Sequence, residues 1–456
     1  MRRSRPLFCL LLAIVILRDA LPNLRAGGET PASDPWLQEA SLSVRESYDD
    51  NILRVSGLGL PEQGSWVSSV AFNLGVNLLP WIGPRGALHT LSLRYQAEAS
   101  AYASAPSENN IAHRWEAAGA GRLGDLNFSA EDSLLIVDGE RRATTYALNE
   151  STGAEANQND RFRNNYAHPY ARDRRSQMQD RASAKMQVDH GPIFARAVAA
   201  LSFYDFHTDL FNNSAVPYRG YQDYLNCYDL NGGMDAGWHL PRGFDLVAGY
   251  RWGFQHQQRF EPATSADQHF SSNHYQRLLI GLEGKVGAVT TVRIAGGPDF
   301  RSYNASAPID QPRTTRWYGE ASMEIAISTT QKLEASFKQW LWVSLNGLIP
   351  FEDITSSLTY RWEPAKAWSF EGGARLLRAN FTIGNDLAGS APSWRDDILY
   401  QLTLSVTHRI TPRWAATLAS SVNLGRNNLP NLPPALYPAY RDFDQRVTSL
   451  SAEYRF

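Results

Sequence analysis

The chain has 456 residues, with 44 Lys and Arg against 46 Asp and Glu, which gives a formal net charge of −2. This balance excludes the strongly basic character of a nucleic-acid-binding protein, so no nucleic-acid partner is expected. Of the two cysteines, Cys9 lies in an apolar N-terminal stretch, which leaves Cys227 without a partner for an internal disulfide bond. Stability must therefore come from burial or from extensive strand pairing.

The N-terminus has the layout of an export signal. Three of the first five residues are Arg, the apolar run 7–17 follows, and short side chains come next. The apolar run is too short for a helix that crosses a membrane. We expect a cleaved signal peptide over residues 1–26, with the cut after either Ala20 or Ala26, and a linker over residues 27–40.

From residue 41 onward, polar and apolar residues alternate with a period of two, in runs long enough for tilted strands to cross a bilayer. In the run 398–408, Tyr400, Leu402 and Leu404 share one face, while Gln401 and Thr403 lie on the other. The alternation predicts eighteen strands, with sixteen as the alternative, at 41–49, 65–78, 87–101, 111–123, 125–138, 177–190, 193–207, 224–240, 243–258, 274–286, 289–302, 315–328, 332–344, 354–363, 367–381, 396–410, 413–425 and 443–456.

The connections between these strands alternate between short and long. Two-residue or three-residue turns, such as 191–192 and 411–412, are separated by long polar segments, such as 139–176 and 427–442. The segment 79–86 is assigned to the short side although it is longer than the other turns. Short periplasmic turns and long extracellular loops are typical of outer-membrane barrels, and an even strand number places both ends of the barrel on the periplasmic side.

The last strand ends in the terminal aromatic residue Phe456, which shares a face with Leu450, Ala452 and Tyr454. This ending resembles the signal by which the outer-membrane assembly machinery recognises its clients, so that machinery is an expected partner. Trp and Tyr residues also gather near strand ends, as expected for interfacial girdles in contact with outer-membrane lipid. The predicted fold is all-β: a single transmembrane antiparallel up-and-down β-barrel over residues 41–456, located in the bacterial outer membrane.

The first strand runs into Tyr48-Asp49-Asp50-Asn51-Ile52, and this segment resembles the start of the outer-membrane β-barrel porin families (porin-2-like) of Gram-negative-type bacteria. The specific match covers about a dozen residues, together with the signal peptide and the terminal Phe. The resemblance implies an outer-membrane location and a barrel architecture. Some members of such families accompany exopolysaccharide export.

If the apolar faces contact lipid, the charged side chains on the strands point into the lumen, because a charge on the lipid face costs about 2–4 kcal/mol at the midplane. Fifteen basic and eleven acidic residues are assigned inward by this argument. The slight excess of bases favours anions. The expected pore-lining residues are Arg94, Arg114, Arg181, Lys185, Arg196, Arg251, Arg277, Arg293, Glu320, Glu324, Glu334, Arg361 and Arg375. Pairing of inward Arg and Glu across neighbouring strands is the structural alternative.

The long connection 139–176 is a candidate constriction loop, because it carries many arginines that could line the lumen. They include Arg161, Arg163, Arg172, Arg174 and Arg175. An exposed loop outside the barrel is the alternative.

No motif for catalysis, a cofactor or a metal site stands out. Asp205, His207 and Asp209 could supply metal ligands at one strand end, and Asp49-Asp50-Asn51 could attract calcium, but solvated loop chemistry accounts for both segments. We therefore expect a porin-like channel that passes small hydrophilic solutes or exports exopolysaccharide, and not an enzyme. The alternatives are a structural or adhesive barrel with a loop-closed lumen, an outer-membrane hydrolase and a secreted β-rich protein. Association into a homo-oligomer stays open.

Overall fold

The structure of the chain is a computed structural model that describes residues 36–52, 63–82, 87–139, 176–206, 226–257, 272–304, 313–343, 350–380, 396–428 and 443–456. Its strands are β1 (Leu37–Asp49), β2 (Ser65–Asn77), β3 (Leu88–Tyr102), β4 (Asn110–Leu123), β5 (Leu126–Asp138), β6 (Gln177–His190), β7 (Ile193–Phe206), β8 (Cys227–Leu240), β9 (Phe244–Gln257), β10 (Asn273–Val286), β11 (Thr290–Tyr303), β12 (Arg313–Ser328), β13 (Gln331–Trp342), β14 (Phe351–Ala365), β15 (Trp368–Asn380), β16 (Asp396–Arg409), β17 (Trp414–Asn428) and β18 (Phe443–Arg455).

Two short helical elements accompany the strands in the part of the chain that the structure describes. The helix α2 (Leu79–Ile82) follows β2, and the 3₁₀ turn η1 (Pro106–Glu108) lies between β3 and β4. Within the described residues, no helix has the length and apolar character needed to cross a membrane. The helix α2 accounts for the extra length of the segment that was assigned to the short-turn side.

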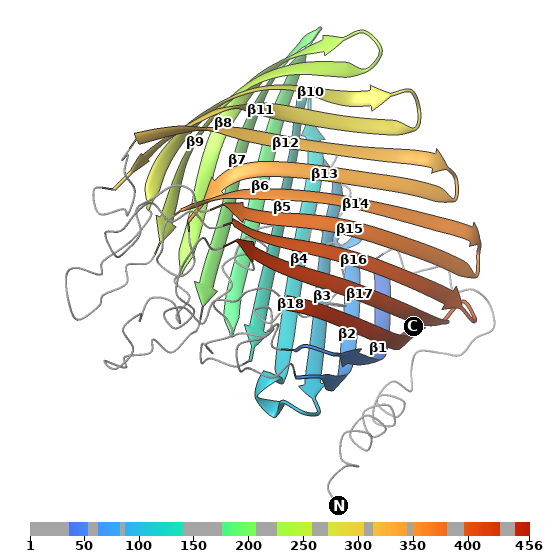
Figure 1. Cartoon of the computed structure of the whole chain (residues 1–456). Coiled ribbons are helices and arrows are strands. Elements are labelled where there is room, and N and C mark those ends of the chain that lie inside the picture. The colour runs from blue at the N-terminus through green and yellow to red at the C-terminus, as the bar shows by residue number, and fades with distance from the viewer. Residues whose placement is uncertain are drawn as a thin grey trace, which may run out of the picture.

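The eighteen strands form one antiparallel sheet in which each strand pairs with its neighbours in the chain, and β1 pairs with β18 to close the barrel. Figure 1 shows β1 in blue and β18 in red lying side by side, with the strands running around the barrel in chain order. The predicted fold class and the number of strands are confirmed. An up-and-down order of this kind follows from connecting each strand to the next across a single turn or loop.

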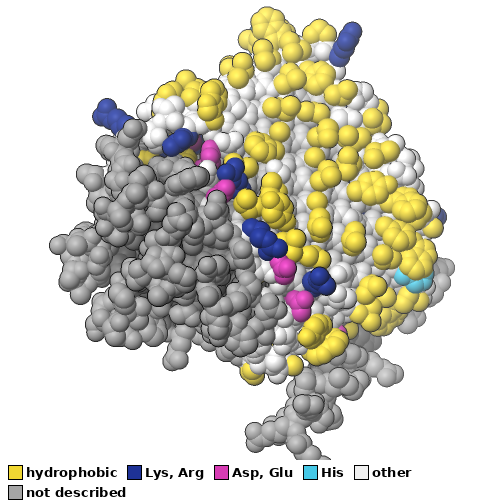
Figure 2. All heavy atoms as spheres, in the orientation of Figure 1, with side chains coloured by type: hydrophobic (Ala, Val, Ile, Leu, Met, Phe, Trp, Pro, Cys, Tyr) yellow, Lys and Arg dark blue, Asp and Glu magenta, His cyan; other side chains and the backbone are white. Residues whose placement is uncertain are grey.

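Alternation sets which side chains face outward. On β16, Leu402 and Leu404 are 55% and 68% exposed, whereas Gln401 between Tyr400 and Leu402 is only 6% exposed. Large apolar side chains are exposed in the same way on the other strands, and Figure 2 shows them as a yellow face across the barrel wall. An apolar outer face on a closed sheet is the arrangement of a barrel that spans a membrane.

Most predicted strand bounds lie within three residues of the observed ones, but the boundary of the N-terminal linker was wrong. The first strand begins at Leu37, so residues 37–40 belong to the barrel and not to a linker over 27–40. A register shift between Leu37 and Glu39, where β1 pairs with β2, interrupts the period of two that the prediction followed. The expected signal peptide over residues 1–26 lies outside the described residues.

The segment behind the family resemblance closes the barrel seam. The Gln445 side-chain amide on β18 donates to both carboxylate oxygens of Asp49, at 3.0 and 2.9 Å, and the backbone N–H of Asn51 donates to the same carboxylate at 3.0 Å. The Asn51 amide in turn donates to the backbone carbonyl of Asp444 at 2.9 Å. These contacts join the first and last strands, so the acidic segment has a structural role that requires no calcium.

The outer face carries acidic side chains amid the apolar residues of β5 and β6. Asp132 on β5 and Asp180 on β6 share the outward parity of Met186 and Leu134. The expectation that the strands point all of their charges inward is therefore wrong for this part of the wall. The neighbouring outward residues Ala182 and Ala184 are small, which leaves both carboxyl groups room at the surface.

Several glycines leave space for aromatic rings on the neighbouring strand. A Cβ at Gly253 on β9 would lie 2.1 Å from the Tyr275 ring on β10, whereas a Cβ at Gly319 on β12 would lie 3.6 Å from its nearest neighbour. We expect Gly253→Ala to lower the free energy of unfolding by about 1–3 kcal/mol because the ring must move. Gly319→Ala is the matched control and should change it by less. Urea unfolding in detergent micelles measures both, and equal midpoints would contradict the packing argument.

Candidate functional site

The lumen contains a cavity of about 1070 Å³ bordered by residues of β3 to β15. Twelve of the thirteen residues expected to line the pore border it, namely Arg94, Arg114, Arg181, Lys185, Arg196, Arg251, Arg277, Arg293, Glu320, Glu324, Glu334 and Arg361. The exception is Arg375, which pairs in register with the buried Gln401 and so lies on the inner face without bordering the cavity. Alternation along each strand brings these side chains to one space.

The cavity wall carries carboxylates that the sequence assignment missed. Asp229 and Asp235 on β8 border the cavity, and among the residues that the structure describes eleven basic and ten acidic ones do so. The assignment missed both aspartates because β8 contains Gly232 and Gly233 at its centre and alternates weakly. The expected excess of bases shrinks to one, so net charge is a weak basis for anion preference. The distribution of charge around the wall matters more.

Opposite parts of the wall differ in charge. The strands β3 to β7 contribute five bases and three acids to the cavity border, and the side chain of one of these acids, Asp132, points outward by alternation. The strands β12 to β15 contribute three bases and four acids. In the strand order, β5 lies nine positions from β14 in both directions, so these two parts of the wall face each other across the lumen.

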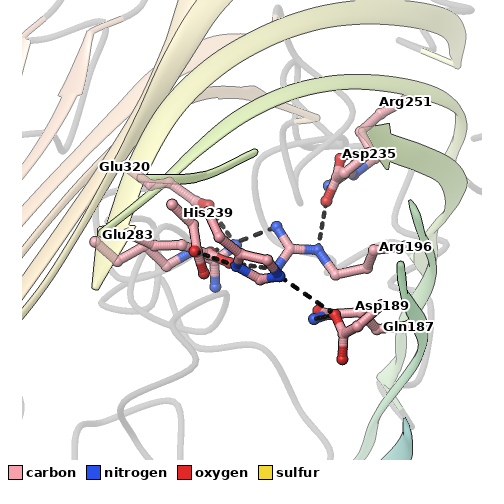
Figure 3. A network of polar contacts seen from close by, with 10 residues as sticks. Gln187, Asp189, Arg196, Asp235, His239, Arg251, Glu283 and Glu320 are labelled. Carbon is pink, nitrogen blue, oxygen red and sulfur yellow. Dashed lines mark hydrogen bonds and ion pairs between the residues drawn. The ribbon is translucent and has the colours of Figure 1, made fainter. Parts of the chain in front are cut away.

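An ion-pair network fixes the side chains on β7 to β10. Arg196 Nε lies 2.8 Å from Asp235 Oδ2, and Arg196 Nη1 lies 2.5 Å from Glu283 Oε1. Arg251 binds the other carboxylate oxygen of Asp235 at 2.5 Å. Figure 3 shows Arg196 between Asp235 and Glu283, with Arg251 on the far side of Asp235. Asp235 is therefore shared by two guanidinium groups and is itself buried.

The network continues along the wall in both directions. Arg293 on β11 links Glu283, at 3.9 Å, to Glu320 on β12, at 3.1 Å. On the short-turn side, His239 lies 2.7 Å from Asp245 and 3.7 Å from Asp189. The structural alternative expected for the inward charges was that they pair across neighbouring strands. In this part of the wall they do pair in that way.

A second cluster lies nearer the long-connection end. Asp299 on β11 accepts from Arg277 at 2.8 Å and from Arg301 at 3.0 Å, and all three side chains are buried. Arg301 also donates to the side-chain oxygen of Gln255 at 2.6 Å. Asp299 and Arg301 share the inward parity of Arg293 but were not assigned to the lumen. These contacts join β9, β10 and β11 near the long-connection end of the barrel.

The lumen is crossed by an element that the sequence did not reveal, here called the inner ledge: residues 340–343 with Phe351. The ladder between β12 and β13 ends at Gly319 and Gln339, although β12 continues to pair with β11 as far as Arg313. The strands β13 and β14 stay paired up to Trp342 and Phe351. The top of β13 and β14 is thereby separated from β12 and is free to bend inward.

The inner ledge contacts strands far from its own place in the wall. The Trp342 ring meets the Tyr204 ring on β7 edge-on, with centroids 6.2 Å apart. The Gln255 side-chain amide on β9 donates to the Leu341 carbonyl at 3.2 Å, and Leu341 is 1% exposed. Since β7 and β9 lie six and four positions from β13 in the strand order, these contacts span the lumen.

Cations and aromatic rings hold the base of the inner ledge. Lys338 Nζ lies 3.4 Å from the centre of the Trp340 ring, and the Arg277 guanidinium lies 3.7 Å from the centre of the Tyr318 ring. On the opposite wall, Arg181 donates to the Tyr204 hydroxyl at 3.1 and 2.5 Å. Desolvated cation–π contacts are worth up to about 2 kcal/mol each, so the ledge is a fixed part of the lumen.

The ledge has a sequence signal that alternation masks. Residues 340–343 are all apolar, whereas a strand with one face toward lipid and one toward water alternates apolar and polar residues. The expected constriction loop, with Arg161, Arg163, Arg172, Arg174 and Arg175, lies outside the described residues. Of the metal candidates, His207 and Asp209 also lie outside them. Within the described part of the chain, no three metal-ligating side chains gather at one place.

No protein-family model and no curated protein matches the chain. Among solved structures, OccAB3 of Acinetobacter baumannii is similar over 92% of this chain and 98% of its own, with 10% identity and a TM-score of 0.40. OccK2 (OpdF) of Pseudomonas aeruginosa, solved in complex with glucuronate, has the same coverage, identity and TM-score. The siderophore receptor PirA of Acinetobacter baumannii matches with 9% identity and a TM-score of 0.39, over 92% of this chain and 80% of its own. The likeness is one of β-barrel fold alone.

The shared carboxylate Asp235 gives a test of the network. In Asp235→Asn, Arg196 and Arg251 lose the negative charge between them, and we expect the free energy of unfolding to fall by about 3 kcal/mol. Glu131→Gln is the matched control, because Glu131 is an exposed carboxylate on the border of the same cavity. Urea unfolding followed by Trp fluorescence measures both variants. An equal effect of the two substitutions would show that the network adds nothing to stability.

Proposed function

We propose that the chain is an outer-membrane channel through which small hydrophilic solutes pass. The observation that carries this proposal is a closed barrel with an apolar outer face around a charged cavity of about 1070 Å³. Such a cavity is larger than the space that packed side chains leave inside a small barrel. Barrels of sixteen to eighteen strands hold aqueous lumens. No catalytic step is proposed.

The inner ledge is proposed as the narrow point of the channel. It crosses the lumen at the end of β13, on the long-connection side, while the ion-pair network lines the wall below it. A solute that enters from outside would meet Tyr204, Trp340 and Trp342 before the charged cavity. A fixed aromatic ledge limits size, and the charges beneath it act on solutes that have passed it.

The first experiment is single-channel recording of the detergent-purified protein in a planar bilayer. Stable current steps support the channel. Silence from protein that shows heat-modifiable gel migration, and is therefore folded, would favour the alternative of a structural or adhesive barrel with a closed lumen.

Substitution of the ledge should widen the pore. We expect Trp342→Ala to raise single-channel conductance by tens of per cent, because the ring that reaches Tyr204 is removed, and Trp342→Phe to have a smaller effect. Trp317→Ala is the control, since Trp317 is 69% exposed on the outer face. If Trp342→Ala and Trp317→Ala conduct equally in folded protein, the ledge is not the narrow point.

Charge on opposite walls should act in opposite directions on ion selectivity. Lys185 on β6 and Glu324 on β12 both border the cavity. We expect Lys185→Gln to move the reversal potential in a KCl gradient toward cation preference, and Glu324→Gln to move it toward anion preference. Shifts in the same direction, or none, would contradict control of selectivity by these two walls.

A further inference from the structure

A row of charged side chains lies on the outer face at the long-connection end of β14 to β18 and β1, here called the outer charged row: Glu352, Arg378, Asp396, Arg426, Asp444, Arg446 and Asp50. Figure 2 shows dark-blue and magenta side chains following one another in a line along the border of the yellow apolar face. On these strands the row shares its parity with exposed Tyr400, Leu418 and Leu450. The charges therefore point away from the lumen.

Two arginines of the row are held in place by carboxylates. Arg378 donates through Nε and Nη2 to Asp396, at 2.8 and 2.7 Å, and its side chain stays 41% exposed. Arg426 uses Nη1 for Asp444, at 2.8 Å, and for the backbone carbonyl oxygens of Gly425 and Phe443. A guanidinium group has five N–H donors, so each of these partly exposed arginines keeps donors that these contacts do not occupy.

The third arginine has a different setting. The Arg446 backbone N–H donates to the Asp50 carboxylate at 2.7 Å, which leaves the exposed Arg446 side chain on the outer surface two residues below Asp444. Arg446 pairs in register with Val422, and Thr448 and Leu450 follow outward on the same strand. The row thus has the apolar belt on one side and the long connections on the other.

The row is not net basic, because Glu352, Asp396, Asp444 and Asp50 accompany the three arginines. A free polyanion would gain little long-range attraction from such a surface. In a layer of lipid phosphates with divalent counter-ions, negative and positive charges alternate in the same way. That layer lies at the level where the apolar belt of a barrel ends. Guanidinium groups bind phosphate oxygens in pairs, and carboxylates accept the divalent cations.

At the same level along the barrel axis, other strands carry outward side chains of a different kind. On β8 to β10, the outward residues Tyr228, Phe254, His256 and His274 form a ring cluster, with Phe254 and His274 centroids 4.6 Å apart. That face has the character of an aromatic interfacial girdle. On β8 to β10, aromatic rings thus take the place that the charged side chains hold on β14 to β18 and β1.

We propose that the outer charged row binds the headgroup of a phosphorylated lipid in the outer leaflet, with its phosphates on Arg378, Arg426 and Arg446. The acyl chains then lie along the apolar residues of β15 to β18 below the row. This binding is independent of the channel function, because none of these side chains borders the cavity.

The test is native mass spectrometry of the detergent-purified full chain with added lipid A, in its diphosphoryl and monophosphoryl forms and with magnesium present. We expect the diphosphoryl form to bind more tightly. The triple variant Arg378→Gln, Arg426→Gln and Arg446→Gln should bind it roughly tenfold more weakly, since several charge-assisted hydrogen bonds are lost. Inorganic phosphate at millimolar concentration should not displace the lipid, because it lacks the acyl chains.

The matched control is Arg409→Gln with Arg413→Gln, two exposed arginines at the short-turn end. It should leave binding unchanged. Arg446→Gln alone breaks no ion pair and should weaken binding on its own, so the proposal can be tested even if the triple variant does not fold. The proposal is overturned if folded Arg446→Gln and triple variants bind like the unchanged protein, if the control loses binding equally, or if inorganic phosphate displaces the lipid.

Discussion

The structure depends on one constraint: every backbone N–H and C=O of a strand in lipid must find a partner within the protein. The pairing of β1 with β18 meets it, because that pairing leaves no edge in the eighteen-stranded sheet. Asp49 and Gln445 strengthen the same seam with side-chain hydrogen bonds. Once the ladder is closed, the parity of each residue decides whether it meets lipid or lumen.

The closed ladder explains both the abundance and the pairing of charges inside. Side chains from neighbouring strands lie about 5 Å apart on the same face, so inward Arg and Asp residues meet across the wall. Arg196 and Arg251 show the result, because the carboxylates of Asp235 and Glu283 balance their two positive charges. A wall built in this way has little net charge, and solutes sense local differences between its sides.

The inner ledge shows what happens where the ladder is interrupted. Above Gly319 and Gln339, the strands β12 and β13 no longer pair, and the apolar residues 340–343 gain more from packing inside than from lipid contact. The same wall therefore supplies the boundary of the lumen and the element that narrows it. On the outer surface of the barrel, Arg378 and Arg426 lie where the apolar belt ends.

The sequence by itself determined the fold, the eighteen strands and the lumen placement of twelve charged residues, because a period of two is local and each strand carries its own signal. It missed Asp229 and Asp235, since the glycines of β8 blur that signal, and it placed the start of β1 too late at a bulge. Only the tertiary structure decided that Trp342 reaches Tyr204 and that Asp49 closes the seam. Those contacts join strands brought together by closure of the barrel, and no local pattern encodes them.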